Sequence, residues 1–227
     1  ITSLSVTGGT CAWDSGGAGG SLAMAGSISQ TAGTLTLGAK TITGVTSFSV
    51  TGTGAITFST VAMGITSFLT VNTGGAVVPG AAITMNGVAT LAISTGPIGP
   101  LVINNTVTVT ASGAGQDVGA LSFTAGSLAV DGFNFQANTA VVSRAVTVAA
   151  GGTFSTIGAL TVSAGGSITA AGTGVVTAGN VLTLSGNGAI TMGTGTLTVS
   201  AGGMALTGSG AVNSGGTAAN AIAVTGN

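Results

Sequence analysis

A short alternating pattern recurs along almost the whole chain and limits what it can fold into. The stretch LTVSAGGSIT (160–169) returns as LTLSGNGAIT (182–191) and again as LTVSAGGMALT (197–207). Alternation with a period of two places Leu160 and Val162 on one side of a strand and Thr161 on the other. The glycines that follow reach turn conformations without steric penalty. The sequence therefore predicts many short β-strands joined by glycine turns.

The spacing of these strands favours one architecture. In the most regular section the strand signals fall at Leu160, Ile168, Val175, Leu182, Ile190, Leu197 and Leu206. Three steps make about 22 residues, which suits one coil of a β-solenoid with three short strands. We therefore predict an all-β fold, a β-solenoid (parallel β-helix) with rungs of about 20 residues, with Val, Leu and Ile ladders inside and hydrogen-bonded Thr and Ser ladders outside. A β-sandwich, with longer strands, is the alternative.

The repeat gives no sign of a domain boundary. We expect residues 1–227 to form a single continuous β-repeat domain. Three segments depart from the pattern, near 10–20, 94–100 and 131–144. We expect these segments to be loops that project from the rod or join its sections.

The scarcity of charge excludes several classes of protein. The chain has two Lys or Arg, three Asp or Glu and no His. A nucleic-acid partner would need clustered basic residues, and a membrane span would need about 20 consecutive apolar residues. The carboxylates, Asp14, Asp117 and Asp131, lie far apart in the sequence and are expected in turns. We predict no enzyme activity and no catalytic, cofactor or metal site.

Three residues are candidates for interactions of another kind. Cys11 stands two residues before Trp13, and we expect a small thiol packed on the aromatic ring. An intermolecular contact through a disulfide is the alternative, because an odd cysteine in an extracellular chain can pair between subunits. Asn104 begins the triplet Asn-Asn-Thr, which matches the acceptor pattern for N-glycosylation.

The two ends of the sequence resemble an interior repeat when they are joined. The chain ends AIAVTGN and begins ITSLSVTGG, and the join resembles AGNVLTLSGNG (178–188). Neither end looks like the polar cap of a soluble solenoid. Because the chain starts without Met, we expect it to be a mature or excised segment. We therefore expect complementary ends, either within a longer chain or between copies stacked head to tail.

These Gly-, Thr-, Ser- and Ala-rich repeats resemble the β-solenoid regions of secreted bacterial surface proteins. Filamentous-haemagglutinin-like adhesins and autotransporter passenger domains are the nearest families, and prokaryotic surface-layer and filament proteins are similar in composition. The resemblance implies an extracellular, structural or adhesive role.

From the residues and the resemblance together, we expect a structural subunit or segment of an extracellular filament, sheath or surface layer, with copies of itself as partners. An adhesin stalk that recognises a glycan or cell surface through loops around Trp13 and Phe133–Phe135 is the alternative. Ice binding by T-x-T pairs such as Thr196/Thr198 is a minor one.

Overall fold

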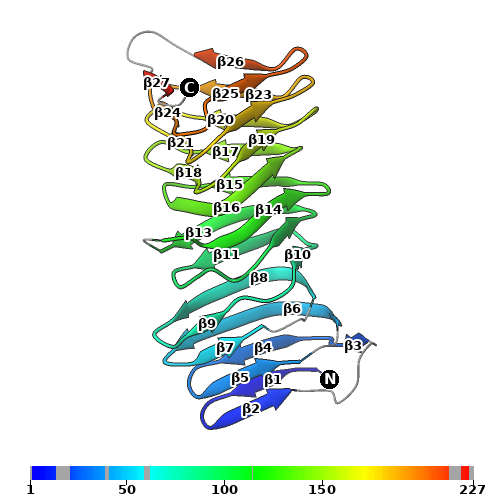
Figure 1. Cartoon of the computed structure of the whole chain (residues 1–227). Helices are drawn as coiled ribbons and strands as arrows, with labels where there is room; N and C mark the ends of the chain where they lie inside the picture. Colours follow the sequence, from blue (N-terminus) through cyan, green and yellow to red (C-terminus); the bar gives the residue numbers. More distant parts are fainter. Residues whose placement is uncertain are drawn as a thin grey trace.

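The protein is a rod of stacked parallel strands (Figure 1). A computed structural model describes residues 2–13, 21–38, 41–58, 62–113, 115–214 and 221–224. These residues contain strands and turns but no helix, and thus none that could cross a membrane. The strands stack as a β-solenoid with rungs of about 21 residues, so the prediction of fold class is confirmed. Parallel pairing throughout contradicts the sandwich alternative, because sandwich sheets are antiparallel.

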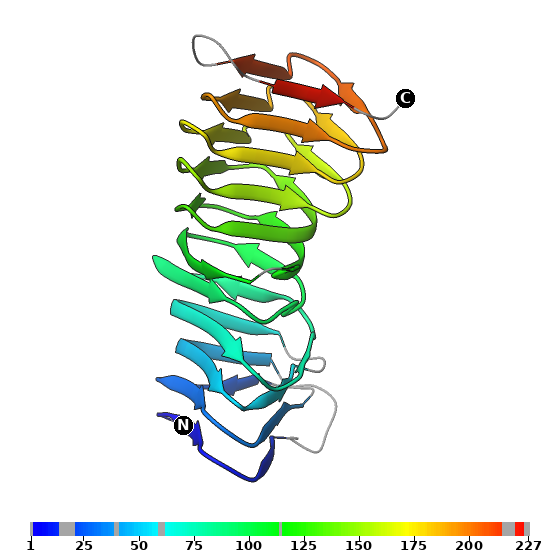
Figure 2. The same ribbon diagram turned by 90° about the vertical axis from the view of Figure 1, so that its left-hand side faces the viewer.

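Most rungs contribute strands to three faces that run along the rod, here called faces A, B and C (Figures 1 and 2). Face A consists of β1 (Leu4–Val6), β4 (Ser27–Gln30), the later parts of β6 (Thr41–Gly52) and β8 (Met63–Thr73), β11 (Ala89–Ile93), β13 (Thr106–Ser112), β15 (Ser127–Val130), β17 (Ala145–Val148), β20 (Ser167–Ala170), β23 (Ala189–Met192) and β26 (Ala211–Ser214). Face B consists of β2 (Thr10–Trp13), β5 (Thr34–Leu37), β7 (Ala55–Thr57), β9 (Val77–Val78), the start of β14 (Val118–Phe123), the first part of β16 (Asn134–Val142), β18 (Thr153–Thr156), β21 (Val175–Ala178), β24 (Thr196–Val199) and β27 (Ala221–Val224). Face C consists of β3 (Ser21–Ala23), the first parts of β6 and β8, β10 (Ile83–Met85), β12 (Leu101–Ile103), the later parts of β14 and β16, β19 (Leu160–Val162), β22 (Leu182–Leu184) and β25 (Met204–Leu206).

The most regular rungs have the register that the sequence predicts. All seven predicted strand signals between Leu160 and Leu206 lie in separate strands, β19 to β25. Leu160 pairs with Leu182, and Ile168 pairs with Ile190. One rung of three strands therefore corresponds to one sequence repeat.

The core is a set of apolar columns inside the rod. Leu160, Val162 and Leu182 are fully buried, whereas Thr161 between them is only half-buried, as the alternation predicts. The side chains of Phe135 and Phe154, on successive rungs of face B, stack with ring centroids 6.2 Å apart. Identical or similar side chains thus cover one another from rung to rung, which removes apolar surface from water without a second layer of structure.

Outward hydroxyl groups bond mainly to the backbone of the preceding rung. Thr147, Thr169 and Thr191 form a column on face A by register. The hydroxyl hydrogen bonds of the described residues lie instead mostly at corners, where Ser163 Oγ donates to the Val142 carbonyl and Thr207 Oγ1 to the Leu184 carbonyl. The predicted outer columns exist, but side-chain hydrogen bonds along them are few, and Ser29 Oγ to Ser5 Oγ at 3.3 Å is one example.

Two segments that were expected to be loops are strands in part. Residues 10–13 form β2, while the rest of the predicted loop, 14–20 with Asp14, lies outside the described residues. Within 131–144, β16 runs from Asn134 to Val142 and bends from face B to face C. The prediction failed because this strand has no glycine at the corner where other rungs have one. Segment 94–100 has no strand, as expected.

Glycines at the corners set the distance between rungs. A Cβ atom on Gly195 would overlap the backbone of Gly174 in the preceding rung, whereas one on Gly8 would meet nothing within 4 Å. We expect Gly195→Ala to destabilise the rod by about 1–3 kcal/mol, because backbone must move. Gly8→Ala is the matched control and should be close to neutral. Urea denaturation compares the two, and equal midpoints would contradict this role of Gly195.

Candidate functional site: an open end and a polar notch

The C-terminal end of the rod leaves its last core layer uncovered. Met204 and Leu206 continue the buried column of Leu182 and Leu184, and Ile222 continues that of Leu197. Yet Leu206 is 54% exposed and Ile222 47%, and Met204 and Val224 are also exposed. Within the described residues, no further rung covers these inward-facing side chains. The last described rung therefore presents an apolar surface bordered by strand edges.

The two ends of the rod match in construction. The last strands on faces A, B and C are β26, β27 and β25, and the first are β1, β2 and β3. Figure 1 shows these two sets at opposite ends of the rod. Each set has one backbone edge that pairs with no strand in the described chain. No residue from 145 to 227 is charged. If a second rod were placed end to end with the first, its three unpaired strand edges would face three unpaired strand edges of the first rod.

The candidate contact residues Cys11 and Trp13 lie at the N-terminal end. Both belong to β2, where Cys11 pairs with Leu35 and Trp13 with Leu37. Cys11 is a free, partly buried thiol that packs against the core. The Trp13 side chain lies outside the part of the structure that is described, so its packing on Cys11 stays a prediction.

A notch opens where face B is interrupted. Among the described residues, face B has no strand between Val78 and Val118, because 94–100, 113 and 115–117 run irregularly. Two adjacent cavities of about 260 and 270 Å³ occupy this gap and share Gly113 and Gly115. Their remaining lining residues are Ser94, Thr95, Gly96, Pro97, Gln116, Asp117, Asn134, Gln136, Thr153 and Ser155.

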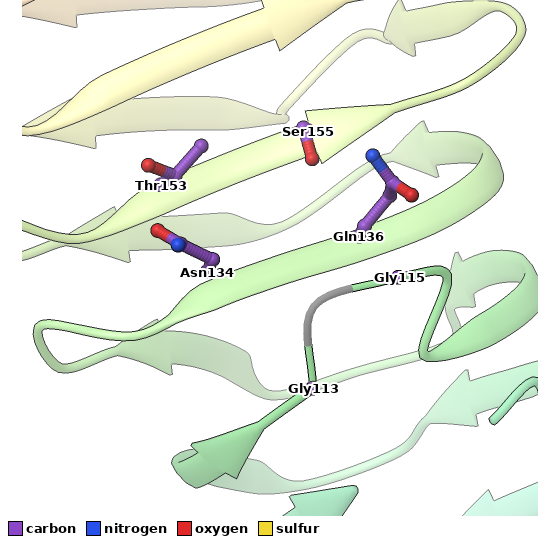
Figure 3. A pocket seen from close by; sticks show the side chains of 6 residues that line it. All are labelled: Gly113, Gly115, Asn134, Gln136, Thr153 and Ser155. Atoms are coloured by element: carbon purple, nitrogen blue, oxygen red, sulfur yellow. The ribbon is translucent and has the colours of Figure 1, made fainter. Parts of the chain in front are cut away.

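One wall of the notch is an array of polar side chains from two neighbouring rungs. Asn134 and Gln136 project from β16, and Thr153 and Ser155 from β18 beside it (Figure 3). The alternate residue, Phe135, points into the core and is 1% exposed. The segment Phe133–Phe135, which we expected in a loop that recognises a glycan or surface, lines the notch with the side chain of Asn134, and of its two rings only Phe133 is exposed.

Asp117 lies beneath the notch and is almost completely buried. Its Oδ2 accepts a hydrogen bond of 2.8 Å from the Gln136 backbone N–H, and its Oδ1 accepts one of 3.3 Å from the Gly113 N–H. Burial raises the pKa of the Asp117 carboxyl group to about 6, although both hydrogen bonds act in the opposite direction. These hydrogen bonds connect the carboxylate to Gly113 and to the next rung. Asp117 directly precedes β14, and the structural turn role that we expected for it stays a prediction.

The other candidate residues lie elsewhere. Asn104 is exposed at a corner, where its Nδ2 donates to Asn86 Oδ1 at 3.1 Å and its Oδ1 accepts from Thr124 Oγ1 at 2.8 Å. A sugar on Nδ2 would replace one of its two hydrogens and leave one N–H that can donate to Asn86 Oδ1. Asp131 is exposed in the turn between β15 and β16. In the described ranges, no three His, Cys, Asp or Glu side chains gather in a group that could hold a metal ion.

Comparison with known proteins gives no further assignment. No protein-family model matches the chain, and neither the curated proteins nor the solved structures searched contain a match. Function must therefore be argued from the two surfaces above.

Proposed function

We propose that the chain is a structural subunit of an extracellular filament, sheath or surface layer, and that copies stack head to tail. The observation that carries this proposal is the uncovered core layer at Met204, Leu206, Ile222 and Val224. Burial of apolar surface at about 25 cal/mol per Å² favours covering it, and another copy offers three parallel edges in the matching positions. A contact of this kind does not close on itself, so it produces a fibre.

The composition supports a role outside the cell and in contact with other copies. With a formal net charge of −1, copies repel one another little. With only Lys40 and Arg144 as basic residues, the chain offers trypsin-like proteases few places to cut. Among the described residues, no group of His, Cys, Asp or Glu side chains could hold a metal ion. The side chains on the outer surface of the rod are mostly small and polar.

A charged residue at the open end should prevent stacking. We expect Leu206→Lys to abolish filaments in electron micrographs of negatively stained protein, since a buried, unpaired ammonium group is strongly unfavourable at the junction. Val141→Lys is the matched control, because Val141 is similarly exposed at 48% but lies outward in the middle of the rod. Filaments of the unchanged chain should show a meridional reflection near 4.8 Å.

Three results would contradict this proposal. The unchanged chain could stay monomeric at high concentration, or Val141→Lys could abolish filaments as completely as Leu206→Lys, which would indicate lateral association. Separate short rods with free ends would instead support a stalk within a longer chain.

A further inference from the structure

We propose that the notch on face B binds a neutral saccharide ring. The notch lies on the side of the rod, with lining residues from the end of β11 to β18 and away from both ends, so this inference does not depend on stacking. It deepens the alternative role of the chain as a binding module by naming the site and the class of ligand.

The lining groups have unused hydrogen-bonding capacity. Within the described residues, the side-chain amides of Asn134 and Gln136 and the hydroxyl group of Thr153 make no hydrogen bond, although their backbone groups do. Ser155 Oγ makes only a long contact of 3.4 Å with the Phe135 carbonyl. Amides and hydroxyls each donate and accept. Four of them in a two-by-two array on adjacent strands match a ring that carries several neighbouring hydroxyl groups (Figure 3).

The size of the notch fits a single ring. Each cavity, at about 260 or 270 Å³, lies just below the range of roughly 300–1,000 Å³ that is usual for drug-sized ligands. Two adjacent cavities that share Gly113 and Gly115 offer room for a ring and the start of its neighbour. Gly113 has no room for a side chain, because a Cβ there would overlap the Ser94 backbone, whereas a Cβ on Gly115 would meet nothing within 4 Å.

The charge of the notch selects a neutral ligand. Among the described residues that line the notch, Asp117 is the only one with an ionisable side chain, and it disfavours a sulfated or acidic sugar. Asp117 does not make the notch a strong cation site, because both carboxylate oxygens already accept backbone hydrogen bonds and no second carboxylate lines the cavities. If copies also stack, the notch repeats along the fibre, and several weak contacts combine into one stronger attachment.

The test is saturation-transfer difference NMR on the full chain, which detects weak ligands of large particles. The probes are the methyl glycosides of glucose, galactose, mannose and N-acetylglucosamine at millimolar concentration. We expect at least one to receive saturation from the unchanged protein. Gly115→Leu, which adds a bulky side chain to the lining of the notch, and Gln136→Ala, which removes one amide, should each weaken binding at least tenfold. Gly8→Leu is the control, because Gly8 is equally open but lies far from the notch.

Several outcomes would overturn the proposal. One is the absence of transfer to all four glycosides, and another is undiminished transfer with Gly115→Leu when its unfolding midpoint matches that of Gly8→Leu. A third outcome is that calcium chloride raises the unfolding midpoint, that Asp117→Asn removes this effect, and that no glycoside receives saturation. This result would assign the notch to a cation instead. Filament formation is scored separately by electron microscopy, so failure of sugar binding leaves the stacking proposal intact.

Discussion

Replacing Phe154 by alanine is expected to lower the free energy of unfolding by about 3–5 kcal/mol. Phe154 is fully buried, and its ring stacks on Phe135 of the preceding rung at an interplanar angle of 10°. The substitution removes both the buried ring and the stacking contact, and it leaves a cavity. The rigid backbone of two stacked rungs can collapse into that cavity only in part. Urea denaturation followed by circular dichroism measures the loss.

Phe68→Ala is the matched control for this experiment. Phe68 points outward from face A and is 39% exposed, so the same change in composition should destabilise by less than about 1 kcal/mol. If both substitutions lowered the free energy of unfolding equally, the stacked rings of Phe135 and Phe154 could not be part of the core. Because solenoid rungs can unfold separately, hydrogen exchange should also show the loss concentrated in the rungs around β18.

Stability should rise on acidification, which is the opposite of most proteins. The pKa of Asp117 in the folded chain is about 6, above its ordinary value of 3.8, so the folded state holds the proton more tightly than the unfolded state. The contribution is fully present below about pH 4 and is lost as the pH rises through about 6. A shift of about two units corresponds to about 3 kcal/mol. With no His or Glu in the chain, little else titrates in this window.

Asp117→Asn should remove this dependence on pH. The amide has nearly the same shape as the carboxyl group but does not ionise, so thermal midpoints of the variant should be flat across the acid and neutral range. Asp131→Asn is the control, because Asp131 is exposed in a turn and the substitution should leave the slope unchanged. A stability maximum near neutral pH in the unchanged protein would show that Asp117 is charged without penalty in the folded state.

The sequence predicts the architecture well where its alternation is regular. From Leu160 to Leu206 each apolar–polar–apolar triplet became one strand, because every inward position is apolar and every corner contains small residues. The same rule is less informative at Gln30, which occupies an inward position between Val6 and Val50. Its Nε2 donates to the Gly33 and Ala55 carbonyls at 3.0 and 2.9 Å, which a strand pattern does not reveal.

The candidate sites differ in how far the sequence predicts them. From the resemblance of the joined ends to an interior repeat we predicted complementary ends, which stays a prediction. The exposure of Leu206 and Ile222 could be seen only in the structure. The notch was not predicted. Its lining comes from Ser94 to Ser155, so residues far apart in the sequence meet only because successive rungs stack. The signals available were the irregular, Gly- and Pro-containing segment 94–100 and the glycines at 113 and 115, which lie where face B is interrupted.

The constant register between neighbouring rungs has a consequence for how such a gene can change in length. Because Leu160 lies under Leu182 and Ile168 under Ile190, duplication or loss of one complete repeat returns every later strand to its original face. The rod would grow or shorten while both ends stayed the same. An insertion of a few residues within a strand would instead shift every following side chain around the axis and bring threonines inward. Natural length variation should therefore occur in steps of whole rungs, with smaller insertions confined to corners.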